Sequence, residues 1–163
     1  MTAGAHGLRV GTAFDAHRLV AGRPLVLGGV TIPHPVGLEG HSDADVVCHV
    51  LCDAILGAAA LGDIGRLFPN TPEWAGASSL DLLRRAFSRV AAAGYALVNA
   101  DCVVVLQAPR IAPYVDEMRA NVASALDATV GQVSIRGTGT DGLGFSGRGE
   151  GAAAQAVVLL TAG

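Results

Sequence analysis

The apolar run Asp101–Leu106 (DCVVVL) limits the choice of fold most strongly. It offers hydrophobic side chains to both faces of a strand, so we expect a strand buried inside a sheet. Helical patterns precede it, from Ser78 to before Gly94, and follow it over Pro113–Leu126. Further strand patterns occupy Val133–Arg136 and Ala152–Leu160. This alternation predicts an α/β or α+β domain with one mixed four-stranded sheet and helices on one face.

The N-terminal half adds a first strand, a small hairpin and a long helix. The strand pattern covers Leu8–Phe14, and Gly28-Gly29 separates two short apolar runs in the manner of a tight hairpin. Ser42 precedes an apolar segment that runs to about Leu61. We expect a helix there, with Ser42 as its N-cap and Asp45 completing a shortened capping box.

Composition narrows the class of protein. Of the 163 residues, 51% are hydrophobic but only 4% are aromatic, so the core must use small aliphatic side chains, and oligomer formation would add buried area. The net charge of -3 argues against nucleic acid as the main partner. Three cysteines without framework spacing favour a reduced, cytoplasmic setting, and no apolar run reaches about 18 residues, which argues against a membrane span. We expect one domain over residues 8–163 after a flexible tail over residues 1–7.

Asp15, His17 and His49 form a candidate metal site. Residues i and i+2 of a strand point to the same face, so Asp15 and His17 could hold one ion at the end of the first strand. His49 would approach from the helix. Zinc favours imidazole nitrogen and carboxylate oxygen, and a catalytic zinc site uses three protein ligands with one position open. The set therefore predicts a catalytic zinc site.

Asp45 and Asp53 flank His49 at spacings of four residues, so all three share one helix face. A solvated polar stripe would explain them without a metal, but most other positions are apolar and the helix should be buried. Buried carboxylates need partners, and these two could accept hydrogen bonds from the imidazoles that bind the ion. Cys48 and Cys52 lie about 100° further around the helix and are expected to be small buried hydrophobes.

Five motifs resemble the cyclodiphosphate synthases of the non-mevalonate isoprenoid pathway. In order along nearly the whole domain they are Phe14–His17 (FDAH), Gly40–Asp45 (GHSDAD) leading to His49, Ala60–Pro69 (ALGDIGRLFP), Gln107–Arg110 (QAPR) and Gly144–Gly151 (GFSGRGEG). The resemblance implies a phosphorus-oxygen lyase that acts on 4-diphosphocytidyl-2-C-methyl-D-erythritol 2-phosphate. The 2-phosphate attacks the β-phosphorus, CMP leaves, and 2-C-methyl-D-erythritol 2,4-cyclodiphosphate remains.

The resemblance also implies cofactors and binding residues. It places one zinc ion per subunit on Asp15, His17 and His49, and a second ion, Mg²⁺ or Mn²⁺, between the phosphates. The residues implied for the phosphate and erythritol groups are His41, Ser42, Asp63, Gly65, Phe68 and Asn70. Those implied for the cytidine and diphosphate groups are Leu106, Gln107, Ala108, Pro109, Arg110, Thr138, Gly139 and Thr140. Asp63 could equally cap a turn, and the start of the helix after Ser42 could attract a phosphate through its N–H groups.

Three positions near the second ion depart from the family pattern. The family's magnesium-binding residue is a Glu, whereas Asp141 stands here and is one methylene shorter. Gly139 and Gly142 stand where the family has Thr and Lys, so one hydroxyl and one basic side chain are missing. Mg²⁺ retains waters readily, so an indirect contact with Asp141 is one way to hold it.

The resemblance further implies a homotrimer with active sites between subunits, where one subunit brings the zinc ligands and its neighbour the cytidine loop. Phe14, Phe145, Arg148 and Glu150 resemble the lining of the family's central channel, which in some members holds an isoprenoid diphosphate. Arg148 and Glu150 could instead form a local ion pair.

Two other functions stay open. A different metal-dependent phosphoesterase on the same scaffold is suggested by the loss of side chains at Gly139 and Gly142. A non-catalytic trimeric module that binds isoprenoid diphosphates is the other alternative. The set of Asp15, His17 and His49 argues against it, because a pure binder has no need of an open zinc position.

Overall fold

The structure is a computed structural model that describes residues 7–163. The expected tail over residues 1–7 therefore lies outside the described residues, apart from Gly7. The strands are β1 (Leu8–Ala21), β2 (Leu25–Leu27), β3 (Val30–Ile32), β4 (Val36–Leu38), β5 (Tyr95–Val105), β6 (Val133–Thr138) and β7 (Gly151–Ala162). The α-helices are α1 (Val46–Ala58), α2 (Ile64–Leu67), α3 (Ser79–Ala92), α4 (Val115–Ala125) and α5 (Gly144–Gly147). Short 3-10 turns cover Pro72–Trp74, Ala112–Tyr114 and Val130–Gln132.

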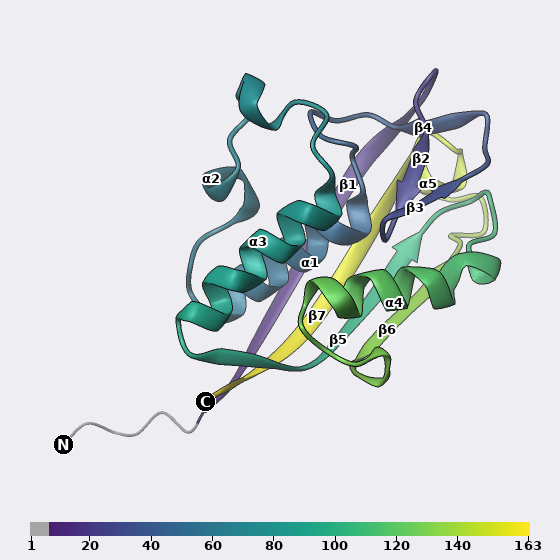
Figure 1. The fold of residues 1–163 in the computed structure, drawn as a ribbon. Helices are drawn as coiled ribbons and strands as arrows, with labels where there is room; N and C mark the ends of the chain where they lie inside the picture. Colours follow the sequence, from purple (N-terminus) through teal and green to yellow (C-terminus); the bar gives the residue numbers. More distant parts are fainter. Residues whose placement is uncertain (1–6) are drawn as a thin grey trace.

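A mixed sheet with strand order β4-β1-β7-β5-β6 forms one layer of the fold. Strands β5 and β6 are parallel, and the other neighbours are antiparallel. Helices α1, α3 and α4 lie together on one face of it (Figure 1). The predicted mixed sheet, the one-sided helices and the β2–β3 hairpin are confirmed.

The predicted number of four strands is wrong, because the sheet has five. Strand β1 does not stop at Phe14 but continues to Ala21, and Val36–Leu38 returns to pair with its far end. A three-residue strand that directly follows Pro33 and Pro35 is too short to show a period of two, so the sequence pattern missed it.

Helix α1 begins later than predicted, and Asp45 rather than Ser42 is its N-cap. Ala44 has a φ of 58°, a left-handed conformation that a right-handed helix cannot contain. The fully buried carboxylate of Asp45 accepts hydrogen bonds from the N–H groups of Val47 and Cys48, and also from those of Gly28 and Gly29 in the hairpin. One side chain thus joins the β2–β3 turn to the start of α1.

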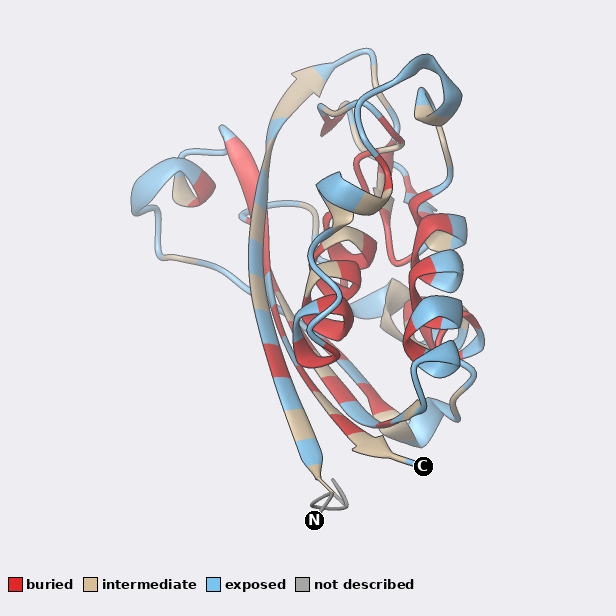
Figure 2. Cartoon of the chain, turned by 90° about the vertical axis from the view of Figure 1, so that its left-hand side faces the viewer, coloured by how far each residue is buried: buried red, intermediate tan, exposed pale blue. Residues whose placement is uncertain are grey.

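Small residues let α1 lie directly on the sheet. A Cβ at Gly11 of β1 would stand 2.0 Å from the carbonyl oxygen of Ala54 and 2.8 Å from the Cβ of Ala58. Beneath α1, the residues of β7 that face the helices are also small: Ala154 and Ala156 are fully buried there. Figure 2 shows the buried residues gathered between the helices and the sheet. The alanine-rich composition is therefore what permits this close approach.

The opposite face of the sheet is not covered by α1, α3 or α4 (Figures 1 and 2). Exposed and more buried residues alternate along β1. Val10 and Phe14 point outward, with 69% and 63% of their surface exposed. Val157 of β7 is 43% exposed on the same face. Among the described residues, no helix has both the length and the apolar character needed to cross a membrane.

Asp45→Ala should lower the free energy of unfolding by about 3 kcal/mol, because it leaves buried N–H groups of the hairpin and the helix without an acceptor. Urea unfolding at one fixed protein concentration measures this. Asp116→Ala is the matched control, since that side chain is 98% exposed, and it should change stability by less than about 0.5 kcal/mol. Equal stability of the two variants would show that the Asp45 junction contributes nothing.

Candidate metal and substrate site

Asp15, His17 and His49 converge on one point between β1 and α1. The Nε2 of His17 lies 2.9 Å from Asp15 Oδ2 and 3.1 Å from His49 Nδ1. His49 Nδ1 lies 3.4 Å from Asp15 Oδ2, and one ligand atom from each residue fits within 4.8 Å of the others. Asp15 and His17 share the helix-facing side of β1, as the i, i+2 spacing predicts, although the strand continues past them.

The outer nitrogen of each imidazole is held by a second group. His17 Nδ1 lies 2.8 Å from the backbone oxygen of Glu39, which can only accept, so Nδ1 carries the proton and Nε2 presents a lone pair to the cluster. His49 Nε2 lies 2.8 Å from Ser79 Oγ and 3.0 Å from Ser42 Oγ. Both imidazoles therefore turn one nitrogen toward Asp15 and anchor the other in the protein.

The cluster favours an ionised carboxylate beside imidazoles. Burial opposes ionisation of Asp15, but the hydrogen bonds that His17 and His49 donate when their imidazoles are protonated outweigh it and hold the pKa of Asp15 well below its usual range. The hydrogen bond to Asp15 raises the pKa of His17 against the opposing effect of burial. A carboxylate and two imidazoles with convergent lone pairs are a suitable donor set for zinc, which would take the place of the proton they share.

A cavity of about 310 Å³ opens beside these ligands. Its wall brings them together with five residues predicted for the phosphate and erythritol groups, namely His41, Ser42, Gly65, Phe68 and Asn70. Asp63 is not part of this wall. It caps α2 by accepting from the Arg66 N–H at 2.8 Å, so the alternative of a turn cap describes its position.

Asp45 and Asp53 were predicted to support the imidazoles, but neither carboxylate hydrogen-bonds to His17 or His49. Asp45 precedes the helix, and its carboxylate binds N–H groups of both the hairpin and the first turn of α1. The carboxylate therefore occupies the helix N-terminus where a phosphate was expected. Asp53 accepts from the Ile64 N–H at 2.7 Å on the cavity wall, and burial raises its pKa. Cys48 and Cys52 are buried and unpaired as expected, and burial raises the pKa of both thiols.

Three residues that shape this site were not predicted from the sequence: Arg23, Asp43 and Ser79. Ser79 and Asp43 are linked to His49 through hydrogen bonds, and Arg23 donates to the backbone oxygens of Gly40 and Ser42. Asp43 lies inside the GHSDAD motif, which was a signal without an assigned role. Ser79 and Arg23 carried no local signal, because their partners are distant in the sequence.

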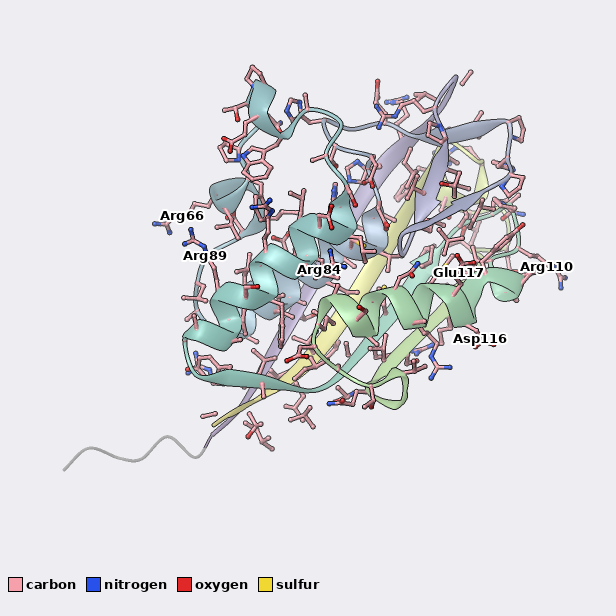
Figure 3. All side chains as sticks on the ribbon, in the orientation of Figure 1. Arg66, Arg84, Arg89, Arg110, Asp116 and Glu117 are labelled. Carbon is pink, nitrogen blue, oxygen red and sulfur yellow. The ribbon has the colours of Figure 1, made fainter. Side chains whose placement is uncertain are left out.

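A second cavity, of about 700 Å³, contains most residues predicted for the cytidine and diphosphate groups. They are Leu106, Gln107, Pro109, Arg110, Thr138 and Gly139, joined by Asp141. Strands β5 and β6 are parallel, so the loops after them leave the same edge of the sheet and meet there. Ala108 and Thr140 are outside the lining, and the Ala108-Pro109 bond is cis. Figure 3 shows Arg110 extending outward near the start of α4.

Three of the four residues predicted for a central channel, Phe145, Arg148 and Glu150, lie in α5 or in the turn between α5 and β7. Arg148 Nε donates to Glu150 Oε1 at 2.7 Å, which matches the alternative of a local ion pair. Phe145 and Glu150 line a hollow of about 210 Å³ together with Arg18. Phe14 is on the exposed face of β1.

Comparisons with known proteins agree with these motifs. The sequence model of the YgbB family matches residues 8–161. The 2-C-methyl-D-erythritol 2,4-cyclodiphosphate synthase of Moorella thermoacetica is 58% identical over 154 residues, which cover 94% of each chain. The enzyme of that name from Geobacillus kaustophilus is 56% identical over 93% of this chain and 97% of its own length.

Solved structures share the fold. The bifunctional IspDF of Campylobacter jejuni matches 96% of this chain with a TM-score of 0.92 and 41% identity, and the match spans 43% of that longer chain. A CDP complex of IspF from Plasmodium falciparum matches 96% of this chain and 97% of its own with a TM-score of 0.85 and 31% identity. The chain therefore belongs to the YgbB family, and its relatives include the 2-C-methyl-D-erythritol 2,4-cyclodiphosphate synthases.

Proposed function

We propose that this chain converts 4-diphosphocytidyl-2-C-methyl-D-erythritol 2-phosphate into 2-C-methyl-D-erythritol 2,4-cyclodiphosphate and CMP, as a phosphorus-oxygen lyase of the cytoplasm. The observation that carries the proposal is the convergence of Asp15, His17 and His49 beside His41 and Ser42 in one cavity. It is supported by 58% identity to a synthase of that name, and the three free thiols suit a reducing compartment.

The three convergent ligands are the residues that would hold a zinc ion. Bound there, zinc would supply a positive charge and Lewis acidity to the diphosphate. A second ion, Mg²⁺ or Mn²⁺, held by Asp141 would offset the remaining negative charge on the phosphates. Asp141 borders the larger cavity with Thr138 and Gly139, and carboxylate oxygen is the donor that these hard cations prefer.

The substrate brings its own nucleophile, so the chain's task is to bind and orient it. An oxygen of the 2-phosphate forms a bond to the β-phosphorus, and the bond from that phosphorus to the oxygen of CMP breaks. His41 and Ser42 would hold the 2-phosphate, and Gly65, Phe68 and Asn70 would enclose the erythritol. All five line the smaller cavity beside the candidate metal ligands. Holding the 2-phosphate against the β-phosphorus lowers the entropy cost of bringing the two reacting groups together.

The cytidine is assigned to the larger cavity after β5 and β6. The loop Leu106–Arg110 offers backbone groups that can read the cytosine edge, and Pro109 shapes the loop. Thr138 and Thr140 bring hydroxyl groups, although Thr140 Oγ1 donates to the Leu143 oxygen at 2.6 Å and would have to turn to reach a phosphate.

We propose further that three copies assemble through the exposed face of the sheet. Val10, Phe14 and Val157 form an apolar surface on a chain whose own core is light in aromatics, and burying it would supplement that core. The Phe145–Glu150 hollow would then lie near the common axis, where an isoprenoid diphosphate could bind. In such a trimer the cytidine cavity of one copy completes the metal cavity of another.

The reaction is tested by ³¹P NMR of the metal-loaded protein with its proposed substrate. We expect equal amounts of CMP and a cyclic diphosphate. Release of CMP together with an open 2,4-bisphosphate would identify water as the nucleophile and favour a phosphoesterase. Absence of CMP would contradict the proposed function. A cytidine diphosphate ester without the 2-phosphate is the control and should stay intact.

Light scattering after gel filtration tests the assembly. The wild type should have about three times the chain mass of 16.4 kDa. Val10→Asp should give a folded monomer, because three buried carboxylates would have to lose their hydration. Val130→Asp is the matched control, since Val130 is also exposed, at 42%, but belongs to the turn before β6. A monomeric wild type would refute the trimer.

A further inference from the structure

His49 differs from His17 in how its outer nitrogen is held. His17 is anchored by a backbone carbonyl, which has a fixed hydrogen-bonding role. His49 is anchored by hydroxyl groups, which can donate or accept. Something else must therefore decide which nitrogen of His49 carries the proton, and only one of the two tautomers presents a lone pair to Asp15 and His17.

We propose that Asp43 and Ser79 act as a positioning pair that fixes the Nε2–H tautomer of His49. The Nδ1 lone pair then points at the cluster. The identity of the ion rests on the proposed function, whereas the tautomer can be measured without any metal.

The pair is built into the start of α3. Ser79 is its first residue and is fully buried. Its Oγ lies 2.8 Å from His49 Nε2 and also hydrogen-bonds to Asp43 Oδ1. The backbone N–H of Ser79 donates to Asp43 Oδ2 at 3.1 Å. Asp43 therefore holds both the hydroxyl and the backbone of the same residue.

The carboxylate sets the direction of the chain of hydrogen bonds. Asp43 Oδ1 also accepts from the Asp45 N–H at 3.2 Å, so Asp43 acts as an acceptor toward all its partners. Ser79 has a single hydroxyl proton, which goes to Asp43. Its oxygen is then left to accept from its two other neighbours, Ser42 Oγ and His49 Nε2, so the imidazole must donate across the 2.8 Å contact.

Ser42 alone cannot make this choice. Its Oγ lies 3.0 Å from His49 Nε2, accepts from the Ala44 N–H at 3.2 Å, and lies 3.2 Å from Ser79 Oγ. Its proton is free to turn toward Ser79 or toward the imidazole. Only Ser79 has a carboxylate partner that fixes its orientation.

A purely structural role is the competing explanation. Asp43 also joins the loop to the segment before α3, since its N–H donates to the Ala77 oxygen at 3.1 Å. If that were its whole role, variants would lose stability without changing the tautomer of His49. The distinguishing readout is therefore the imidazole itself.

Long-range ¹H–¹⁵N NMR of metal-free protein labelled at histidine provides that readout, at a pH where the imidazoles are neutral. Wild type should show His49 with a protonated Nε2 and a bare Nδ1. Ser79→Ala and the isosteric Asp43→Asn should both shift His49 toward a mixture of its two tautomers. In Ser79→Ala only the freely turning Ser42 hydroxyl faces Nε2, and in Asp43→Asn the amide can either donate to or accept from Ser79. Ser79→Thr keeps the hydroxyl and should retain the wild-type tautomer. Ser88→Ala is the matched control on the same helix, where Ser88 Oγ only donates to the Arg84 oxygen.

Zinc affinity, measured by competition with a chelator, gives the second readout. Ser79→Ala and Asp43→Asn should weaken zinc binding about tenfold or more, as loss of an outer partner does in metal sites, while Ser79→Thr and Ser88→Ala stay near the wild type. A wild-type tautomer in both Ser79→Ala and Asp43→Asn, or a protonated Nδ1 in the wild type, would overturn the proposal. Failure of the wild type to bind zinc, with the Nε2–H tautomer present, would count against the proposed metal and leave the positioning pair standing.

Discussion

The close contact of α1 with β1 is the constraint on which the rest of the structure depends. Gly11 has no space for a side chain, because the backbone of α1 fills the place of its Cβ. Any larger residue would lift the helix and separate His49 from Asp15 and His17, which come from the sheet. The candidate metal ligands are therefore brought together by the packing of small residues some distance away from them.

Polar anchors then fix the ligands within that frame. Asp45 secures the start of α1 to the hairpin through four N–H groups, and His49 follows one turn later. The Glu39 carbonyl and the Ser79 hydroxyl hold the outer nitrogens of the two imidazoles. Such supporting contacts fix the orientation in which each side chain presents its donor atom to an ion.

Local patterns predicted much of this arrangement. The spacing of Asp15 and His17, the buried helix carrying His49 and the run at Asp101–Leu106 all reflect side-chain periodicity, which a single sequence displays directly. The strand β4 was missed because three residues show no period. The positions of Asp45 and Ser79 were missed because their hydrogen bonds join segments far apart in the chain, and no local pattern records such contacts.

We propose that Asp15, His17 and His49 hold the cation on which ring closure depends. Titration of zinc into metal-free protein, with saturating Mg²⁺ and with bound zinc and released CMP measured in the same samples, tests it directly. We expect no CMP without zinc, and a rate of CMP release that rises in proportion to bound zinc up to about one ion per chain. His49→Ala should bind little zinc and release little CMP throughout. Full turnover by zinc-free wild type, or a His49→Ala titration like that of the wild type, would contradict the claim.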